Sequence, residues 1–141
     1  MSIMVKDVMD KDVPTVKLDT KIKEVVRILV KHNVRFVPVV NDTGLVVGAI
    51  SETDLMKLVR IQPLATTSAV WTNVPRDISE KTAVDIMIHR PITINERAEI
   101  SDALNLMSVS NVNVLIVLDM TNKLAGLVRF RKIIEKMLEK I

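Results

Sequence analysis

Three polar side chains, Ser51, Thr53 and Asp54, stand in a short run that could hold a nucleotide. They follow the apolar stretch Leu45 to Ile50, and a second apolar segment begins at Leu55. A carboxylate can accept hydrogen bonds from two adjacent ribose hydroxyls, and the N–H groups at a helix start favour a phosphate. The same run is also a capping-box pattern, with Ser51 as the cap and Asp54 at the third helical position. Both interpretations stay open, and they can coexist with Thr53 on the ligand and Ser51 on the helix.

The elements around this run follow from the apolar periodicity. A helix capped by Asp19 or Thr20 is predicted over about residues 20 to 32, from apolar residues at helical spacing: Ile22, Val25, Val26, Leu29 and Val30. A hairpin is predicted next, because two runs rich in β-branched residues, 36–40 and 45–50, flank the turn at Asn41 to Gly44. With a short extended piece at Thr15-Val16 and a second helix from Ser51, the order of elements is β-α-β-β-α.

The second half of the chain repeats the first at an offset of 78 residues. No gap is needed over about sixty residues, which is hard to obtain by accident, so the chain holds two copies of one unit. The second copy predicts strands at 92–94, 112–118 and 124–128 and a last helix to Ile141. It also predicts a helix that carries Ile100, Ala103, Leu104 and Met107. The identical pairs are Asp7/Asp85, Met9/Met87, Thr15/Thr93, Ile22/Ile100, Asn33/Asn111, Val34/Val112, Val39/Val117, Thr43/Thr121 and Gly48/Gly126.

The strand predicted at 112–118 indicates how the copies pack. It is almost continuously apolar, interrupted only by Asn113, which favours burial on both faces. A three-stranded sheet with two helices leaves an open apolar face, so the copies should pack sheet against sheet with pseudo-two-fold symmetry. The predicted fold class is α/β (α+β), with repeat 1 at 1–60, a connector at 61–80 and repeat 2 at 81–141. Trp71, in the connector, is expected to anchor that segment to the core.

Composition excludes several classes of protein. The 141 residues contain no cysteine, which excludes disulfides and cysteine nucleophiles and favours a cytoplasmic protein. No apolar run approaches the roughly 18 residues of a membrane span, so no membrane association is expected. The histidines, His32 at a helix end and His89 in a loop before Pro91, lack metal-ligand spacing, and three glycines cannot build a phosphate loop. No catalytic or metal site is predicted, and the chain is expected not to be an enzyme.

The repeated unit resembles a tandem pair of CBS domains, the Bateman module, over essentially the whole chain. Three features carry the resemblance: Val8-Met9 ahead of Pro14-Thr15-Val16, the stretch NVRFVPVV from Asn33, and GAISETDL from Gly48. The resemblance implies that each cleft between the copies is shared, with Asp54 on the ribose hydroxyls and the hydroxyl residues Ser51 and Thr53 near the phosphates. It also implies that the other copy supplies the remaining nucleotide-binding residues, Ile92, Val112, Asn113 and Val114.

The second copy departs from this pattern, because three cations stand at the matching positions: Arg129, Arg131 and Lys132. A ribose cannot be held there in the same way. The resemblance implies that this opposite cleft also includes Arg35, with Pro14, Val34 and Phe36. Three interpretations stay open, in this order: an empty cleft with solvated charges, a cleft that binds phosphate, sulfate or a polyphosphate tail, and a basic face for nucleic acid or an acidic partner.

The leading hypothesis is a regulatory module that senses an adenosine nucleotide, AMP, ADP or ATP, binds no other cofactor and signals to an unidentified partner protein. A homodimer is expected, because CBS pairs commonly form dimers and because eight methionines and a mean hydropathy of +0.28 would leave a monomer with bare apolar surface. Two alternatives stay open. One is a nucleic-acid-binding protein that uses the basic second cleft, since a net charge of +3 permits this without implying it. The other is a structural interaction dimer with a decayed site.

Overall fold

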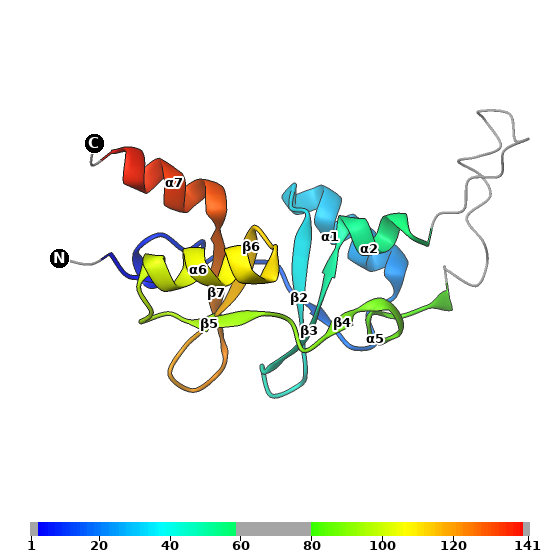
Figure 1. The fold of residues 1–141 in the computed structure, drawn as a ribbon. Coiled ribbons are helices and arrows are strands. Elements are labelled where there is room, and N and C mark those ends of the chain that lie inside the picture. The colour runs from blue at the N-terminus through cyan, green and yellow to red at the C-terminus, as the bar shows by residue number, and fades with distance from the viewer. Residues whose placement is uncertain (1–2, 59–79, 140–141) are drawn as a thin grey trace, which may run out of the picture. The chain divides into compact units, whose positions relative to one another are not determined.

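The computed structural model describes residues 3–58 and 80–139, which form two compact units (Figure 1). The first unit is Pro14–Arg90, and the second combines Met1–Val13 with Pro91–Ile141. Each unit carries its own sheet, flanking helices and apolar core, so the predicted mixed α/β class with two sheets is confirmed. Trp71 and all of the predicted connector except Glu80 lie outside the described residues.

The first unit is a four-stranded sheet in the order β1-β2-β3-β4. β1 is parallel to β2, and the β2/β3 and β3/β4 pairs are antiparallel. β2 is buried along most of its length, as its β-branched composition favours. The elements are β1 (Val16–Lys17), α1 (Ile22–His32), β2 (Phe36–Val40), β3 (Val46–Ser51), α2 (Glu52–Met56), α5 (Ala83–Ile86) and β4 (Ile88–His89).

The second unit repeats this plan around a three-stranded sheet, β5-β6-β7, with β5 parallel to β6 and β6 antiparallel to β7. Its buried residues include Leu115 and Val117 from the sheet, Met107 and Ile133 from the helices, and Val5 from the N-terminal segment. The elements are η1 (Val5–Asp7), β5 (Thr93–Asn95), α6 (Ile100–Ser110), β6 (Val114–Leu118), β7 (Leu124–Arg129) and α7 (Phe130–Leu138).

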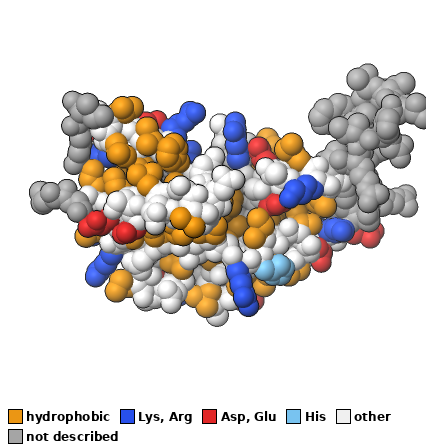
Figure 2. Space-filling view, in the orientation of Figure 1, with side chains coloured by type: hydrophobic (Ala, Val, Ile, Leu, Met, Phe, Trp, Pro, Cys, Tyr) orange, Lys and Arg blue, Asp and Glu red, His pale blue; other side chains and the backbone are white. Residues whose placement is uncertain are grey.

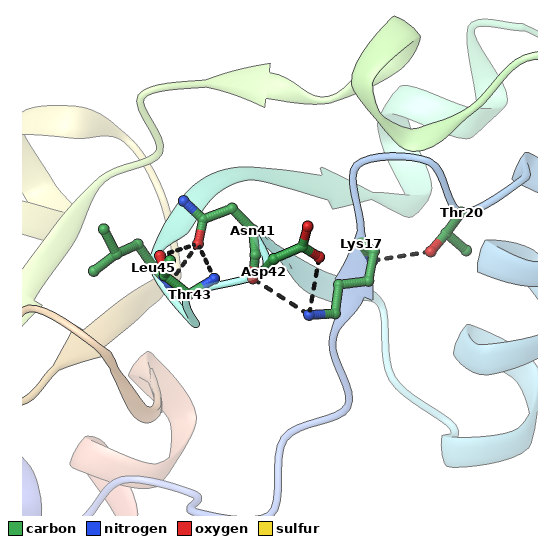
Figure 3. A network of polar contacts seen from close by, with 6 residues as sticks. All are labelled: Lys17, Thr20, Asn41, Asp42, Thr43 and Leu45. Carbon is green, nitrogen blue, oxygen red and sulfur yellow. Dashed lines mark hydrogen bonds and ion pairs between the residues drawn. The ribbon is translucent and has the colours of Figure 1, made fainter.

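Several identities between the copies have a local physical cause. Asn33 and Asn111 end α1 and α6 in the left-handed conformation, with φ of 51° and 55°, which asparagine tolerates better than most residues. Asn41 Oδ1 closes the turn between β2 and β3, because it accepts hydrogen bonds from Thr43 N (3.0 Å), Thr43 Oγ1 (2.7 Å) and Leu45 N (3.0 Å) (Figure 3). Asp119 closes the matching turn in the second unit through Thr121 and Lys123.

The first segment of each sequence repeat belongs to the structural unit of the other repeat. The predicted repeat boundaries did not indicate this exchange. β4, from the start of the second repeat, pairs Ile88 with Ala49 on β3. The N-terminal segment does the same in the second unit, where Asp10 pairs with Leu127 on β7. At both crossings the neighbouring residue is a glycine. A Cβ on Gly48 would lie 2.9 Å from Met87 Cγ, and a Cβ on Gly126 would lie 3.2 Å from the backbone carbon of Asp10.

Two sequence predictions are wrong in detail. α1 begins after Lys21 and has no side-chain cap, so neither Asp19 nor Thr20 serves as its N-cap. Thr20 instead accepts a hydrogen bond from Lys17 N at 2.9 Å, as Figure 3 shows. His89 lies in strand β4 rather than in a loop, because the exchanged segment pairs with β3.

Candidate functional site

The run from Ser51 to Asp54 forms the predicted capping box where β3 passes into α2. Ser51 Oγ accepts a hydrogen bond from Asp54 N at 3.2 Å. Asp54 Oδ2 in turn accepts from Ser51 N at 3.0 Å and from Ser51 Oγ at 2.9 Å. The extended backbone of Ser51, with φ −110° and ψ 162°, is the conformation that an N-cap requires.

This capping box uses only one of the two carboxylate oxygens of Asp54. Among residues 3–58 and 80–139, hydrogen bonds reach Oδ2 only, and Oδ1 accepts none. Ser51 and Asp54 are half-buried, whereas Thr53 is exposed. The capping role and a ligand role are therefore compatible, with Oδ1 and the Thr53 hydroxyl as the atoms available to a ligand. α2 is only five residues long, so its dipole adds less to phosphate binding than that of a long helix.

Arg35 lies beside this junction in the first unit. Its carbonyl accepts a hydrogen bond from Glu52 N at 2.9 Å, and its Nε lies 3.9 Å from Glu52 Oε2. The two side chains are 90% and 54% exposed, so this ion pair adds little stability. Arg35, predicted for the second cleft, thus contacts the helix that carries Asp54.

The matching junction of the second unit has the same backbone and opposite charge. Phe130 N donates to Asn113 O at 2.9 Å, as Glu52 N does to Arg35 O. No side chain caps α7, whose N-cap is Arg129. Arg129 Nε donates to Asp10 Oδ2 at 2.9 Å, so the exchanged N-terminal segment supplies its counter-charge. The sequence alone did not indicate this pair, because its partners are far apart along the chain.

Arg131 and Lys132 complete the basic end of α7. Both are exposed, and within the described residues neither forms an ion pair. The second unit therefore offers two solvated cations and one paired cation where the first unit offers two hydroxyls and a carboxylate.

The residues predicted to wall the nucleotide site all belong to the second unit. Val112 is half-buried and packs against the core, and Val114 begins β6 opposite Arg129. Asn113, between them, is exposed, and Ile92 is half-buried just before β5. The predicted cleft draws its hydroxyl and carboxylate residues from one unit and these walls from the other, so it stays a prediction.

A surface hollow of about 480 Å³ in the second unit was not predicted from the sequence. Two of its acids have structural partners: Asp7 accepts from Met4 N at 3.0 Å, and Asp119 closes its turn. In the described part of the chain, no three His, Cys, Asp or Glu side chains are grouped to hold a metal ion. The hollow is lined by Lys6, Asp7, Met9, Lys11, Glu96, Asp119 and Ala125.

Comparison with known proteins identifies the family. CBS domains match at two positions, residues 5–61 and 83–139, and the chain belongs to the CBS domain family as a tandem pair. It is 33% identical over 132 residues to a CBS domain-containing protein of Dictyostelium discoideum, which covers 91% of this chain and 86% of that protein.

Two solved structures are similar over nearly the whole chain. A crystal structure of CBSX2, a CBS-pair protein of Arabidopsis thaliana, in complex with AMP has a TM-score of 0.79 and 25% identity, covering 97% of each chain. The CBS domain pair of protein MJ0100, in complex with 5′-methylthioadenosine and S-adenosyl-L-methionine, has a TM-score of 0.73 and 26% identity, covering all of both chains. Within the described residues, no helix is long and apolar enough to cross a membrane.

Proposed function

We propose that this CBS pair is a regulatory module that binds one adenosine-containing ligand per chain and reports its presence to a partner protein. The observation that carries the proposal is the Asp54 carboxylate at the β3–α2 junction, held by Ser51 and keeping Oδ1 available. Support also comes from the similar proteins crystallised with AMP, 5′-methylthioadenosine and S-adenosyl-L-methionine.

The chemistry shared by those three compounds is the adenosine group. Each has an adenine base and a ribose with adjacent hydroxyls, whereas only AMP has a phosphate. A carboxylate suits the adjacent hydroxyls, so Asp54 is assigned to the ribose. The exposed Thr53 hydroxyl is assigned to the group at the ribose 5′ position. Ile92, Val112 and Val114 are assigned to the adenine faces, with Asn113 at the edge of the base. AMP, ADP and ATP are the ligands favoured by this proposal.

The second cleft is assigned no nucleoside, because Lys132 stands where a ribose carboxylate would be needed. The Asp10–Arg129 pair neutralises one cation of that cleft. Arg131 and Lys132 remain solvated and could attract an anion, in keeping with the forked hydrogen bonding of arginine. One ligand per chain is therefore the proposed stoichiometry.

Signalling to a partner requires that the ligand bind one state of the module better than another, since equally tight binding to both states shifts nothing. We propose a homodimer as the signalling form and a separate regulated protein as the recipient. The role proposed is regulatory rather than catalytic.

A thermal-shift and calorimetric titration with AMP, ADP, ATP and S-adenosylmethionine tests the proposal. At ~100 times the dissociation constant, a ligand should stabilise the fold by about 2.7 kcal/mol, or several degrees. Asp54→Ala should abolish the shift. Asp85→Ala is the matched control, because Asp85 forms the same capping box with Thr82, whose N donates to it at 2.9 Å, at the start of a different helix.

The two variants separate the ligand role of Asp54 from its capping role. Both should lower the melting temperature by a similar amount, since each loses a capping acid, but only Asp54→Ala should lose ligand binding. Equal ligand shifts in the parent and in Asp54→Ala would leave Asp54 as a helix cap. No shift in the parent with any compound would favour an interaction module without a nucleotide.

A further inference from the structure

The surface hollow of the second unit lies at the other end of its sheet from the residues assigned to a nucleotide. Its lining comes from the turn after β6, the start of β7, the residue after β5 and the N-terminal segment. The cleft residues of this unit instead precede or begin β5 and β6, or lie at the end of β7 and the start of α7. Along β7, Ala125 and Arg129 are four residues apart, or about 13 Å at the usual rise of a strand. The hollow is therefore a separate place, and its volume of about 480 Å³ is within the roughly 300–1,000 Å³ of small-molecule sites.

Two half-buried acids of the hollow have carboxylate oxygens that accept no hydrogen bond from the described residues. Thr121 N, Thr121 Oγ1 and Lys123 N all donate to Asp119 Oδ1, which leaves Oδ2. The Glu96 side chain has neither a hydrogen bond nor an ion pair within the described part of the chain. Because a half-buried carboxylate is only partly hydrated, one without a protein partner favours a bound cationic donor.

Two lysines and an apolar surface complete the hollow. Lys6 and Lys11 are exposed, and among residues 3–58 and 80–139 neither forms an ion pair, so both ammonium groups can bind an anion. Lys6 is held next to Glu96, because its backbone N donates to Glu96 O at 2.9 Å. Met9 and Ala125, both half-buried, supply the apolar surface. Figure 2 shows acidic and basic side chains near each other where Figure 1 places the N-terminal segment of this unit.

The first unit shows that the fold does not require these charges. At the offset of 78 residues, Glu96 matches Leu18, which packs against the apolar core of the first unit. Asp119 matches Asn41, which makes the same three turn contacts without a charge. The second unit therefore carries charge at positions where its architecture does not need it, and side chains of this kind are available for binding.

We propose that this hollow binds the zwitterion of a free α-amino acid with an aliphatic side chain. The ammonium group of the ligand donates to Glu96 and to Asp119 Oδ2, and its carboxylate accepts from Lys6 and Lys11. Its side chain packs on the apolar surface, where the thioether of Met9 adapts to different shapes. A ligand with charge of one sign only meets a like charge in the same hollow, which disfavours it. This site goes beyond the proposed adenosine function and does not depend on it.

A titration of the ¹⁵N-labelled full chain with L-leucine, followed by NMR, tests the inference. Saturable shifts are expected at the amides of residues 5–11, 96–98 and 119–125. The dissociation constant should be about 1 mM, because a surface hollow covers only part of the ligand. N-acetyl-leucine lacks the ammonium group and leucinamide lacks the carboxylate, so each should bind at least about ten-fold more weakly.

Variants separate the two charged arms of the site. Glu96→Gln should weaken L-leucine binding at least about ten-fold, because it removes a charged acceptor. Lys6→Val, which introduces the valine found at the matching position of the first unit, should weaken it by about three-fold, since an exposed charge contributes less. Glu135→Gln, at an exposed acid of α7 outside the hollow, is the matched control and should bind as the parent does. A dispersed amide spectrum verifies that each variant folds.

Asp54→Ala should also bind L-leucine as the parent does, so a failure of the adenosine proposal can be told from a failure of this one. Shifts that are absent or do not saturate would overturn the amino-acid site, and so would Glu96→Gln with the affinity of the parent. Equal affinity for leucinamide would replace the zwitterion by a simple amine, such as a peptide N-terminus. Equal affinity for N-acetyl-leucine would replace it by a simple anion.

Discussion

The two strand-to-helix junctions, Ser51–Glu52 in the first unit and Arg129–Phe130 in the second, share a backbone and differ in their side chains. Both cap residues have φ of −110°, and both following amides donate to the matching carbonyl at 2.9 Å. The first junction carries the Ser51–Asp54 capping box, and the second carries Arg129, whose guanidinium is paired with Asp10. The side chains at these junctions therefore do not determine the backbone conformation of the unit, and they are free to differ in function.

The largest expected effect is on stability, when each of the two crossing glycines, Gly48 and Gly126, is replaced by alanine. A Cβ at Gly126 would press on the backbone of Asp10, which cannot move without disturbing the pairing with Leu127. A Cβ at Gly48 would meet mainly the flexible Met87 side chain, although Ile88 O would lie 3.0 Å away. Gly126→Ala should therefore lower the free energy of unfolding by about 3 kcal/mol and Gly48→Ala by about 1 kcal/mol.

Urea unfolding of both variants, with equal m-values as a check on two-state behaviour, measures this difference. Equal losses at the two glycines would contradict the inferred contrast between a backbone contact and a side-chain contact.

A second prediction concerns a variant in which the polar side chains of the first junction are placed at the second junction. The triple variant Arg129→Ser, Arg131→Thr and Lys132→Asp gives the second junction the polar residues of the first. Its cleft should gain a ribose carboxylate, and adenosine binding there should tighten by at least about 100-fold, since hydrogen bonds to a charged acceptor contribute about 1.5–3 kcal/mol each. Calorimetry should then find two ligands per chain.

The control for the transplant is the same triple change combined with Asp54→Ala, which should bind one ligand. A stoichiometry of one in the triple variant with Asp54 intact would show that the junction residues do not suffice for a site.

The smallest expected effect concerns the two hairpin turns. Hydrogen bonds from the Thr121 side chain and from Lys123 and Thr121 amides lower the pKa of Asp119 below its ordinary value of 3.8. Because the folded-state pKa is depressed, the contribution of this carboxylate is complete above pH 3.8 and is lost as the pH falls through the lower folded value. Asn41 makes the same three contacts without titrating.

Asp119→Asn should therefore leave the melting temperature at neutral pH nearly unchanged and make the loss of stability below pH 3.8 less steep. Melting curves at a series of acidic pH values measure both effects. If the melting temperature of Asp119→Asn fell with pH as steeply as that of the parent, other carboxylates would be responsible for the acid sensitivity.

Local patterns predicted most of the fold and the local structure of the Ser51–Asp54 run, whereas the ligand role of these residues stays a prediction. The hairpin, the Ser51–Asp54 box and the helices depend on residues close together in sequence, and they were confirmed. The start of α1 at Ile22 was missed, because the preceding residue, Lys21, pairs with the distant Thr82. The Asp10–Arg129 pair also depends on a tertiary contact. The identity of Gly48 and Gly126 at the offset of 78 residues was a signal that another segment packs closely against these positions.

The exchanged segments mean that one sequence repeat does not encode one folding unit. A fragment ending near residue 60 would keep β1 to β3 but lack β4, and its N-terminal segment would have no β7 to pair with. Such a fragment would have an uncovered sheet edge at β3 and a loose strand able to cover the edge of another molecule. Halves of this chain are therefore expected to complement one another in trans, or to assemble by swapping, rather than to fold as independent monomers.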